Sequence, residues 1–311
     1  MKKYALIVAI IGCFYSVMGQ QKNNSFTNHK ITQIEAGIKD YAVAILNAKE
    51  MIDRFRADSL FTRGLVQALK IPYSFGYRFD SLITISQLYA PDSSFRIFTW
   101  QVMKDFSSYH QKGAIQMKTV DGSLKLFPLF DYSDYTDFPG DSIRNINNWI
   151  GAVYYNIVLK TFNNKNYYTL LGYDENNART TKKWMEVLSF DVEGKPTFGG
   201  RYFNYPPDSI KLPQPAYRFC LEFKKQASAK FNYDPDIDRI VFAHLVSETG
   251  EIREKQTLIP YGSYEGFRWQ NGKWWYEKNI ESADPKPSNN TSNGPSNGTG
   301  LQLKPKKKNL N

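Results

Sequence analysis

The chain has 311 residues, of which 41% are hydrophobic and 15% aromatic, and it carries a formal net charge of +10. This is enough for one large or two modest domains with a real core. Six of the positive charges lie at the two ends, at Lys2, Lys3, Lys304, Lys306, Lys307 and Lys308. The body therefore carries about +4, which is no nucleic-acid footprint. We predict no nucleic-acid partner.

Residues 1–19 have the pattern of a secretory signal peptide. A charged start at Lys2 and Lys3 precedes an apolar run, and Val17 and Gly19 fit the positions before a cleavage site. We predict an exported protein, located in the periplasm or at the cell surface. The apolar run is shorter than the ~20 residues that span a bilayer, so no transmembrane helix is expected in the mature chain.

Cys13 leaves an alternative open, because residues 10–13 resemble a lipobox, in which this cysteine would be lipidated and would anchor the protein. The aromatic residues Phe14 and Tyr15 that follow favour simple secretion. With Cys13 removed or lipidated, Cys220 has no partner for an intrachain disulfide. The alternating pattern around Cys220 predicts a small buried hydrophobe.

Residues 20–75 predict a helical N-terminal segment. Apolar residues spaced by four and three place one amphipathic helix at about 30–56. Asp58-Ser59 has the pattern of an N-cap, which predicts a second helix that continues through Leu69.

Residues 76–280 change to a period of two with frequent turn signals, which predicts an antiparallel β domain. Strands are expected at 95–102, 115–118, 124–127, 152–159, 167–173, 184–190, 218–224, 229–233 and 239–244. The predicted fold class is α+β, predominantly an antiparallel β meander, sandwich- or barrel-like, preceded by two N-terminal α-helices. A propeller-like topology stays open.

The clearest hairpin has Asn271-Gly272 at its turn, because both residues tolerate the positive φ of a type I′ turn. Trp269, Trp274 and Tyr276 give this hairpin a large aromatic area. We expect these rings to pair across the strands in the core; a recognition platform is the alternative.

Residues 281–311 predict a disordered linker with a basic tail. Asn, Ser, Gly, Pro and Thr dominate the first part of this segment, and it has almost no apolar residue to bury.

An acidic and aromatic cluster at residues 131–141 is the first place where we expect a ligand. The candidate ligand-binding residues are Asp131, Tyr132, Asp134, Tyr135, Asp137 and Asp141. Rings stack on sugar faces and carboxylates bond hydroxyl groups, and paired carboxylates also catalyse glycoside hydrolysis. A packed connection without a ligand is the alternative.

The other motifs predict no metal and no cofactor. Asp234, Asp236 and Asp238 resemble the start of a calcium loop, but Arg239 and Leu245 occupy the positions that need glycine and glutamate. We therefore predict an acidic turn. The three histidines lie far apart, so zinc is unsupported. The sequence has no nucleophile elbow, phosphate loop or dinucleotide fingerprint, and we assign no catalytic residue.

Two parts of the chain, residues 167–174 with 182–198 and residues 264–274, resemble a family of uncharacterised exported proteins of the Bacteroidota type. The resemblance covers roughly residues 80–280. It implies export to the cell envelope and carries no assigned activity. It also implies O-glycosylation at Asp-Ser-apolar motifs, which occur at Ser59, Ser81, Ser142 and Ser209. Asp-Ser pairs that simply start helices and turns are the alternative.

These patterns predict an exported cell-envelope protein that acts as a non-catalytic binding or structural module. The expected partner is a glycan or another envelope protein. The alternative is a glycan-active hydrolase that uses the carboxylates of the 131–141 loop.

Overall fold

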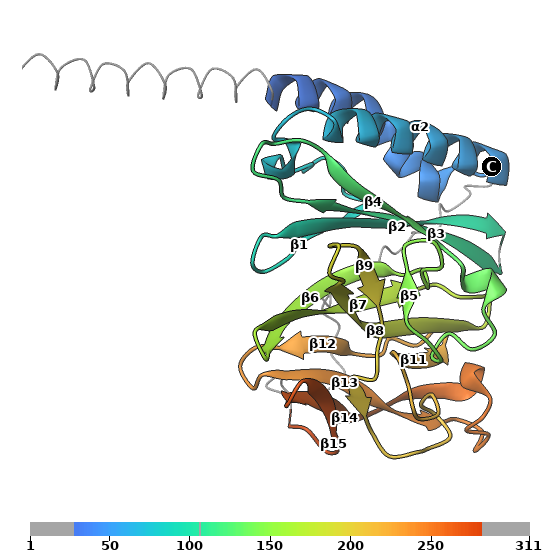
Figure 1. Ribbon diagram of the computed structural model, residues 1–311. Coiled ribbons are helices and arrows are strands. Elements are labelled where there is room, and N and C mark those ends of the chain that lie inside the picture. Colours follow the sequence, from blue (N-terminus) through green and yellow to red (C-terminus); the bar gives the residue numbers. More distant parts are fainter. Residues whose placement is uncertain (1–27, 106, 282–311) are drawn as a thin grey trace, which may run out of the picture.

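The computed structural model describes residues 28–105 and 107–281. Two N-terminal helices are followed by three mostly antiparallel β-sheets, and Figure 1 shows them stacked in four layers with the helices at one end. The predicted α+β class, with two helices before a β-rich body, is confirmed. The predicted signal peptide with Cys13, and the linker and tail after residue 281, lie outside the described residues.

The two helices form a hairpin, and its turn lies earlier than the sequence predicts. The first helix spans residues 28–47, and α2 spans Met51–Leu69. The guanidinium of Arg54 donates to the carbonyls of Ala48 (2.9 Å) and Lys49 (2.8 Å), where the first helix has ended. These bonds satisfy carbonyls that a helix end leaves free. No glycine or proline marks the break, which explains why the apolar pattern alone predicts one helix to residue 56.

The predicted N-cap at Asp58-Ser59 is wrong. Asp58 lies inside α2, where it is buried and accepts a hydrogen bond from Trp100 Nε1 at 2.7 Å. A partner 42 residues away therefore explains this aspartate. Gly64 has a packing role in the same helix, because a Cβ there would lie 2.3 Å from Ile38 Cγ2 on the first helix.

The first sheet lies under the helices and has the order β1-β2-β3-β4. Its strands are β1 (Ser86–Tyr89), β2 (Phe95–Asp105), β3 (Ser108–Met117) and β4 (Lys125–Phe130). The ring of Phe61 on α2 meets Trp100 on β2 edge-on, with centroids 5.2 Å apart. The helices and the first sheet therefore share a hydrophobic core.

The middle sheet has the order β5-β9-β8-β7-β6, and β11 also pairs with β8. Its strands are β5 (Arg144–Asn145), β6 (Val153–Phe162), β7 (Lys165–Asp174), β8 (Thr180–Phe190), β9 (Pro196–Phe198) and β11 (Phe219–Lys224). The third sheet has the order β10-β15-β14-β13-β12. Its strands are β10 (Phe203–Asn204), β12 (Phe231–Asp234), β13 (Arg239–Ser247), β14 (Leu258–Gln270) and β15 (Lys273–Glu277). The pair β10–β15 is parallel, whereas the other strand pairs within the sheets are antiparallel.

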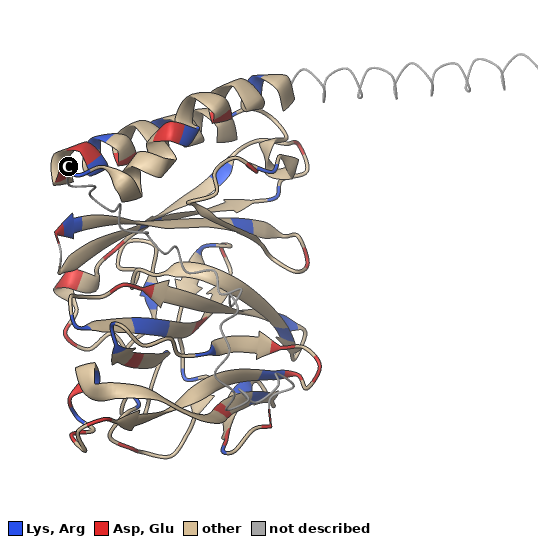
Figure 2. Ribbon diagram, turned by 180° about the vertical axis from the view of Figure 1, so that it is seen from behind, with Lys and Arg blue, Asp and Glu red and all other residues tan. Residues whose placement is uncertain are grey.

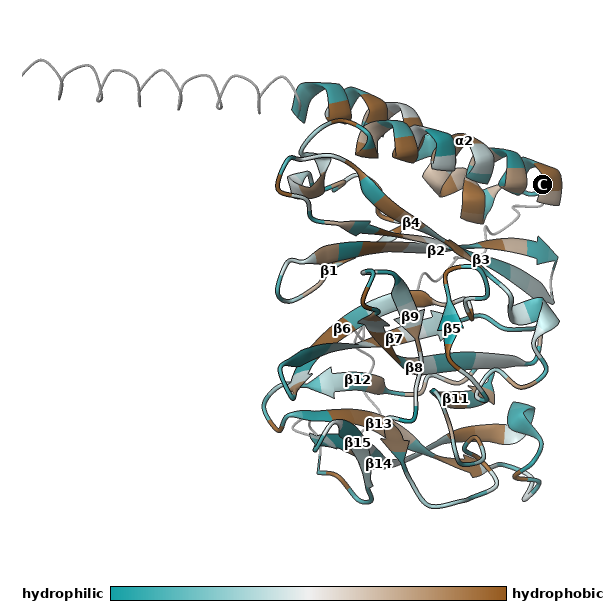
Figure 3. Ribbon diagram, viewed as in Figure 1, coloured by the Kyte–Doolittle hydropathy of each residue, from teal (hydrophilic) through white to brown (hydrophobic). Residues whose placement is uncertain are grey.

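Both faces of the middle sheet are buried. On β8, Trp184 and Leu188 pack toward the first sheet, while Met185 and Val187 pack toward the third sheet. Figure 3 shows hydrophobic residues on the strands of all three sheets. A strand covered on both faces has no polar side, and this explains the unbroken burial of residues 184–189.

The local turn signals were sound predictors. Asn271 (φ 50°) and Gly272 (φ 74°) form the β14–β15 turn, with Gln270 opposite Lys273. Trp269 and Trp274 pair across it with centroids 5.3 Å apart, and Trp274 is fully buried, so the core prediction for this hairpin is confirmed. The acidic turn between β12 and β13 is confirmed as well.

Charged residues are not concentrated in any one layer of the stack. Figure 2 shows acidic and basic positions interspersed along the helices and all three sheets. Three short helical turns complete the described elements: η1 (Ser74–Gly76), η2 (Ser133–Tyr135) and η3 (Lys255–Thr257).

Candidate functional site

The acidic cluster forms the connection between β4 and β5, and Asp131 fixes its first end. Asp131 Oδ1 accepts from the backbone N of Ser133 (3.0 Å) and of Gly151 (3.2 Å), and Oδ2 accepts from the N of Gln111 (2.8 Å). Gly151 must lack a side chain, because a Cβ would lie 2.3 Å from Gln111 Cβ. Asp131 therefore ties the loop to β3 and to the segment before β6.

A buried ion pair fixes the other end of the loop. Arg218 Nε lies 3.2 Å from Glu186 Oε2, and both side chains are buried. Arg218 Nη1 also donates to the carbonyls of Pro139 and Ser142. Tyr154 donates to the same glutamate, and burial raises the pKa of its phenol. Both ends of the loop are therefore anchored by hydrogen bonds, those of Asp131 at the first end and those of Arg218 at the other.

Between these anchors, the loop and the ends of three strands enclose a cavity of about 180 Å³. Such a volume is below the roughly 300–1,000 Å³ of drug-sized sites, so it suits one sugar ring or one side chain. The loop contributes Asp131, Ser133, Asp134, Thr136, Asp137 and Pro139. The other walls are Tyr109 and Gln111 of β3, Ile150, and, from the middle sheet and its β7–β8 turn, Asp174, Asn176, Lys182 and Trp184.

Two buried polar atoms of this lining have no hydrogen-bond partner among the described residues: Gln111 Oε1 and Trp184 Nε1. The two residues are only 2% and 4% exposed. Gln111 Nε2 donates to Asp174 Oδ1 at 3.0 Å, which leaves the amide oxygen as the free end. An unpaired buried donor or acceptor costs about 1–3 kcal/mol, so each of these two atoms would gain from a hydrogen-bond partner.

Charged groups surround the same space. Burial raises the pKa of the Asp174 carboxyl, and hydrogen bonds from Asn176 N (2.8 Å) and Gln111 oppose this only in part. The ammonium of Lys182 lies 6.0 Å from the centre of the Trp184 ring. Asp134 forms an ion pair with Lys104 at 2.5 Å.

Exposed apolar side chains crowd the loop. Tyr135 is 76% and Phe138 74% exposed, and Tyr132 stacks near Tyr135 with centroids 5.1 Å apart. Phe130, Tyr132 and Ile143 are exposed as well. Exposed apolar patches mark interaction sites, and the contact between Tyr132 and Tyr135 places these two rings side by side.

The structure separates the six predicted residues into two groups. Asp131, Asp134 and Asp137 line the cavity, whereas Tyr132, Tyr135 and Asp141 lie outside its lining. Asp141 instead accepts from Ser142 Oγ (2.7 Å) and pairs with Arg144 (2.9 Å), and these contacts lower its pKa.

Sequence reasoning missed the other walls, Gln111, Asp174, Lys182 and Trp184. Asp174 was visible as the polar end of the predicted strand 167–173, but nothing in its own segment relates it to Asp131.

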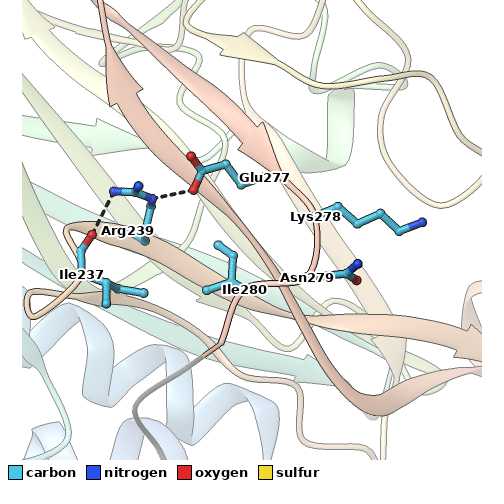
Figure 4. A pocket seen from close by; sticks show the side chains of 6 residues that line it. All are labelled: Ile237, Arg239, Glu277, Lys278, Asn279 and Ile280. Carbon is cyan, nitrogen blue, oxygen red and sulfur yellow. Dashed lines mark hydrogen bonds and ion pairs between the residues drawn. The ribbon is translucent and has the colours of Figure 1, made fainter.

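A second, larger hollow of about 450 Å³ lies beside the end of β15 (Figure 4). The one carboxylate among the described residues of its lining, Glu277, is already paired, because Arg239 lies 2.5 Å from it and Arg268, outside the lining, lies 3.1 Å from it. This hollow therefore offers a ligand less than the smaller cavity does.

The remaining predicted positions have plain surroundings. Cys220 is buried, and burial raises the pKa of its thiol. Ser59, Ser81 and Ser209 are exposed, and Ser142 is half-buried. Ser59 lies within α2, while the Ser81 hydroxyl donates to Glu35 at 2.7 Å.

Within residues 28–105 and 107–281, the side chains of His, Cys, Asp and Glu form no group of three or more that could hold a metal ion. In this part of the chain, each helix is too short or too polar to cross a bilayer.

The described residues form a β-rich α+β fold with a small polar cavity between its first and middle sheets. No family model, curated protein or solved structure matches the chain. The resemblance to exported proteins of the Bacteroidota type stays a prediction.

Proposed function

We propose that the protein is an exported cell-envelope module that binds a glycan, without catalysis, in the cavity between the β4–β5 connection and β8. The two unpartnered buried atoms, Gln111 Oε1 and Trp184 Nε1, carry this proposal. One needs a donor and the other an acceptor, and a sugar ring offers both in its hydroxyl groups.

The surroundings support a glycan over a peptide. The cavity holds about one ring, while the exposed rings of Tyr132, Tyr135 and Phe138 on the same loop offer stacking faces to neighbouring sugars. The anchors of the loop hold these groups in place before the ligand arrives, which reduces the entropy lost on binding.

A glycan array followed by calorimetry with the best glycans tests the proposal. We expect millimolar to micromolar affinity that falls about tenfold in Trp184→Phe, because this variant removes the N–H and keeps an aromatic ring. Trp275→Phe is the matched control, because Trp275 lies on β15 and its Nε1 donates to Gln270 O at 3.1 Å. Equal loss in both variants, or no glycan bound at all, would contradict the proposal.

A glycan-active hydrolase is the second candidate. Asp174 has a raised pKa and would act as the acid, and Asp137 of the loop would act as the base for an attacking water. The test is a panel of glycosides incubated with the protein and with Asp137→Asn. Turnover that the substitution abolishes would replace the binding proposal; unchanged glycans, recovered after long incubation, would dismiss the hydrolase.

The export part of the proposal rests on residues 1–19. Cell fractionation should recover the protein outside the cytoplasm, and labelling with a radioactive fatty acid distinguishes a free chain from one lipidated at Cys13.

A further inference from the structure

The lining of the cavity is acidic. The lining contains one cation, Lys182, and four carboxylates, those of Asp131, Asp134, Asp137 and Asp174. Their surroundings differ, because Lys104 neutralises Asp134 and backbone N–H groups surround Asp131.

Asp174 has less compensation, because both of its hydrogen bonds go to Oδ1. Its hydrogen-bond donors are the uncharged groups of Asn176 and Gln111, and within the described residues no ion pair of 4 Å or less reaches it. Lys182 lowers the pKa of this carboxyl through space, but burial outweighs that effect and the net shift is upward. The anionic form of Asp174 is therefore poorly stabilised in the empty cavity.

A positive group of the ligand would supply the missing compensation. A metal ion fits poorly, since the described residues contain no cluster of ligands that could hold one. An ammonium group fits better, because it carries a positive charge and three hydrogen-bond donors for a lining that contains four carboxylates.

We propose, on the basis of the proposed glycan binding, that the sugar bound in this cavity carries a free amino group. The preferred ligand is an amino sugar within a glycan, and sugars with a carboxylate are rejected.

Four matched β-1,4-linked tetrasaccharides and a simple amine test this inference by calorimetry at neutral pH. The sugars carry a 2-hydroxyl, a 2-acetamido or a 2-amino group, or a uronic acid; the amine is n-butylamine. We expect the amino sugar to bind at least about tenfold more tightly than the hydroxyl sugar, because charged hydrogen bonds are stronger than neutral ones. The uronate should show no binding.

Two variants locate the effect. Asp174→Asn should lower the affinity for the amino sugar by at least about tenfold and so abolish its preference over the hydroxyl sugar. Asp141→Asn is the matched control outside the lining and should keep the preference.

Each other outcome has a distinct meaning. Equal affinity for amino and hydroxyl sugars overturns this inference and leaves glycan binding standing. If n-butylamine binds and none of the four sugars does, both the proposed glycan binding and this inference are overturned. A preference for the amino sugar that survives Asp174→Asn, or no binding by any of the five compounds, also overturns the inference.

Discussion

Two buried polar regions, on opposite sides of the first sheet, differ in one respect. The first surrounds Arg96 of β2, which is fully buried and has no carboxylate partner within the described residues. Its guanidinium donates to Gln116 Oε1 (2.8 Å), Ser74 O (2.9 Å), Tyr77 O (2.6 Å) and Tyr89 Oη (2.8 Å). Four rings surround it at 4.8–5.7 Å: Phe75, Phe79, Tyr89 and Phe98.

The cavity, in contrast, leaves Gln111 Oε1 and Trp184 Nε1 unpaired. Burial lowers the pKa of Arg96 only to about 10, so this arginine stays charged at neutral pH. All three nitrogens of its guanidinium donate hydrogen bonds. The hydrogen bonds of Arg96 serve stability, whereas the two unpaired atoms of the cavity lining still need partners.

The largest expected effect on stability comes from removing the guanidinium of Arg96. Arg96→Met keeps an unbranched apolar stem but removes the guanidinium with its hydrogen bonds to Gln116, Tyr89 and the carbonyls of Ser74 and Tyr77. We therefore expect a loss of about 4 kcal/mol in the free energy of unfolding. Urea denaturation measures it. Arg78→Met is the control, because the Arg78–Asp80 pair is exposed and should contribute less than about 0.5 kcal/mol. Similar losses in both variants would contradict a structural role for Arg96.

The buried ion pair that anchors the loop gives the next effect. Glu186→Gln leaves Arg218 without its counter-charge and should cost about 3 kcal/mol in thermal or urea unfolding. Glu193→Gln, in the exposed pair with Lys195, is the control and should leave stability nearly unchanged, because water and salt screen an exposed pair. A neutral result for Glu186→Gln would show that the loop does not depend on this anchor.

One substitution at two tryptophans compares a free N–H with a bonded one. Trp184→Phe should cost about 1–2 kcal/mol for the lost ring volume alone. Trp274→Phe loses the same volume and also the bond from Nε1 to Thr169 Oγ1 (2.9 Å), so it should cost about 1 kcal/mol more. Urea unfolding of both variants decides this. An equal or larger cost at Trp184 would mean that its N–H is satisfied in the free protein.

The smallest effect is a gain in stability from Asp174→Asn. Since the folded pKa of Asp174 is raised above the unfolded value of about 3.9, the folded state holds this proton more tightly. Stability from this group is therefore present below that unfolded value and is lost as pH rises through the raised pKa. The substitution should remove this slope and add about 0.5 kcal/mol at pH 7 in denaturation curves at pH 3–7. A loss at pH 7 would contradict it.

The parts of the fold that local chemistry determines were predictable. Asn271-Gly272 defines its hairpin wherever the strands lie, and the period of two placed the longer strands. The layers were not predictable, because β9 and β11 both pair with β8 and the sequence shows no signal for that arrangement. The turn between the two helices was not predictable for a similar reason. Arg54 satisfies the carbonyls at the end of the first helix, where a glycine usually helps to cap.

The sequence predicted part of the candidate site. The spacing of acids and rings identified the loop, and Asp131, Asp134 and Asp137 do line the cavity. Trp184 comes from a strand that the sequence predicts as ordinary structure, whereas Gln111 lies in the part of β3 that precedes the predicted strand 115–118. Only the stacking of the first sheet on the middle sheet brings them to the loop, and that depends on long-range packing.

The middle sheet has a consequence for how the protein accommodates an occupant. Trp184 faces the cavity side of β8, and its neighbour Met185 is fully buried in the opposite core. Strands enclosed on both faces open only when the whole molecule unfolds, so their amide protons should exchange most slowly. Any induced adjustment on binding therefore belongs to the β4–β5 connection, while the wall behind it stays still.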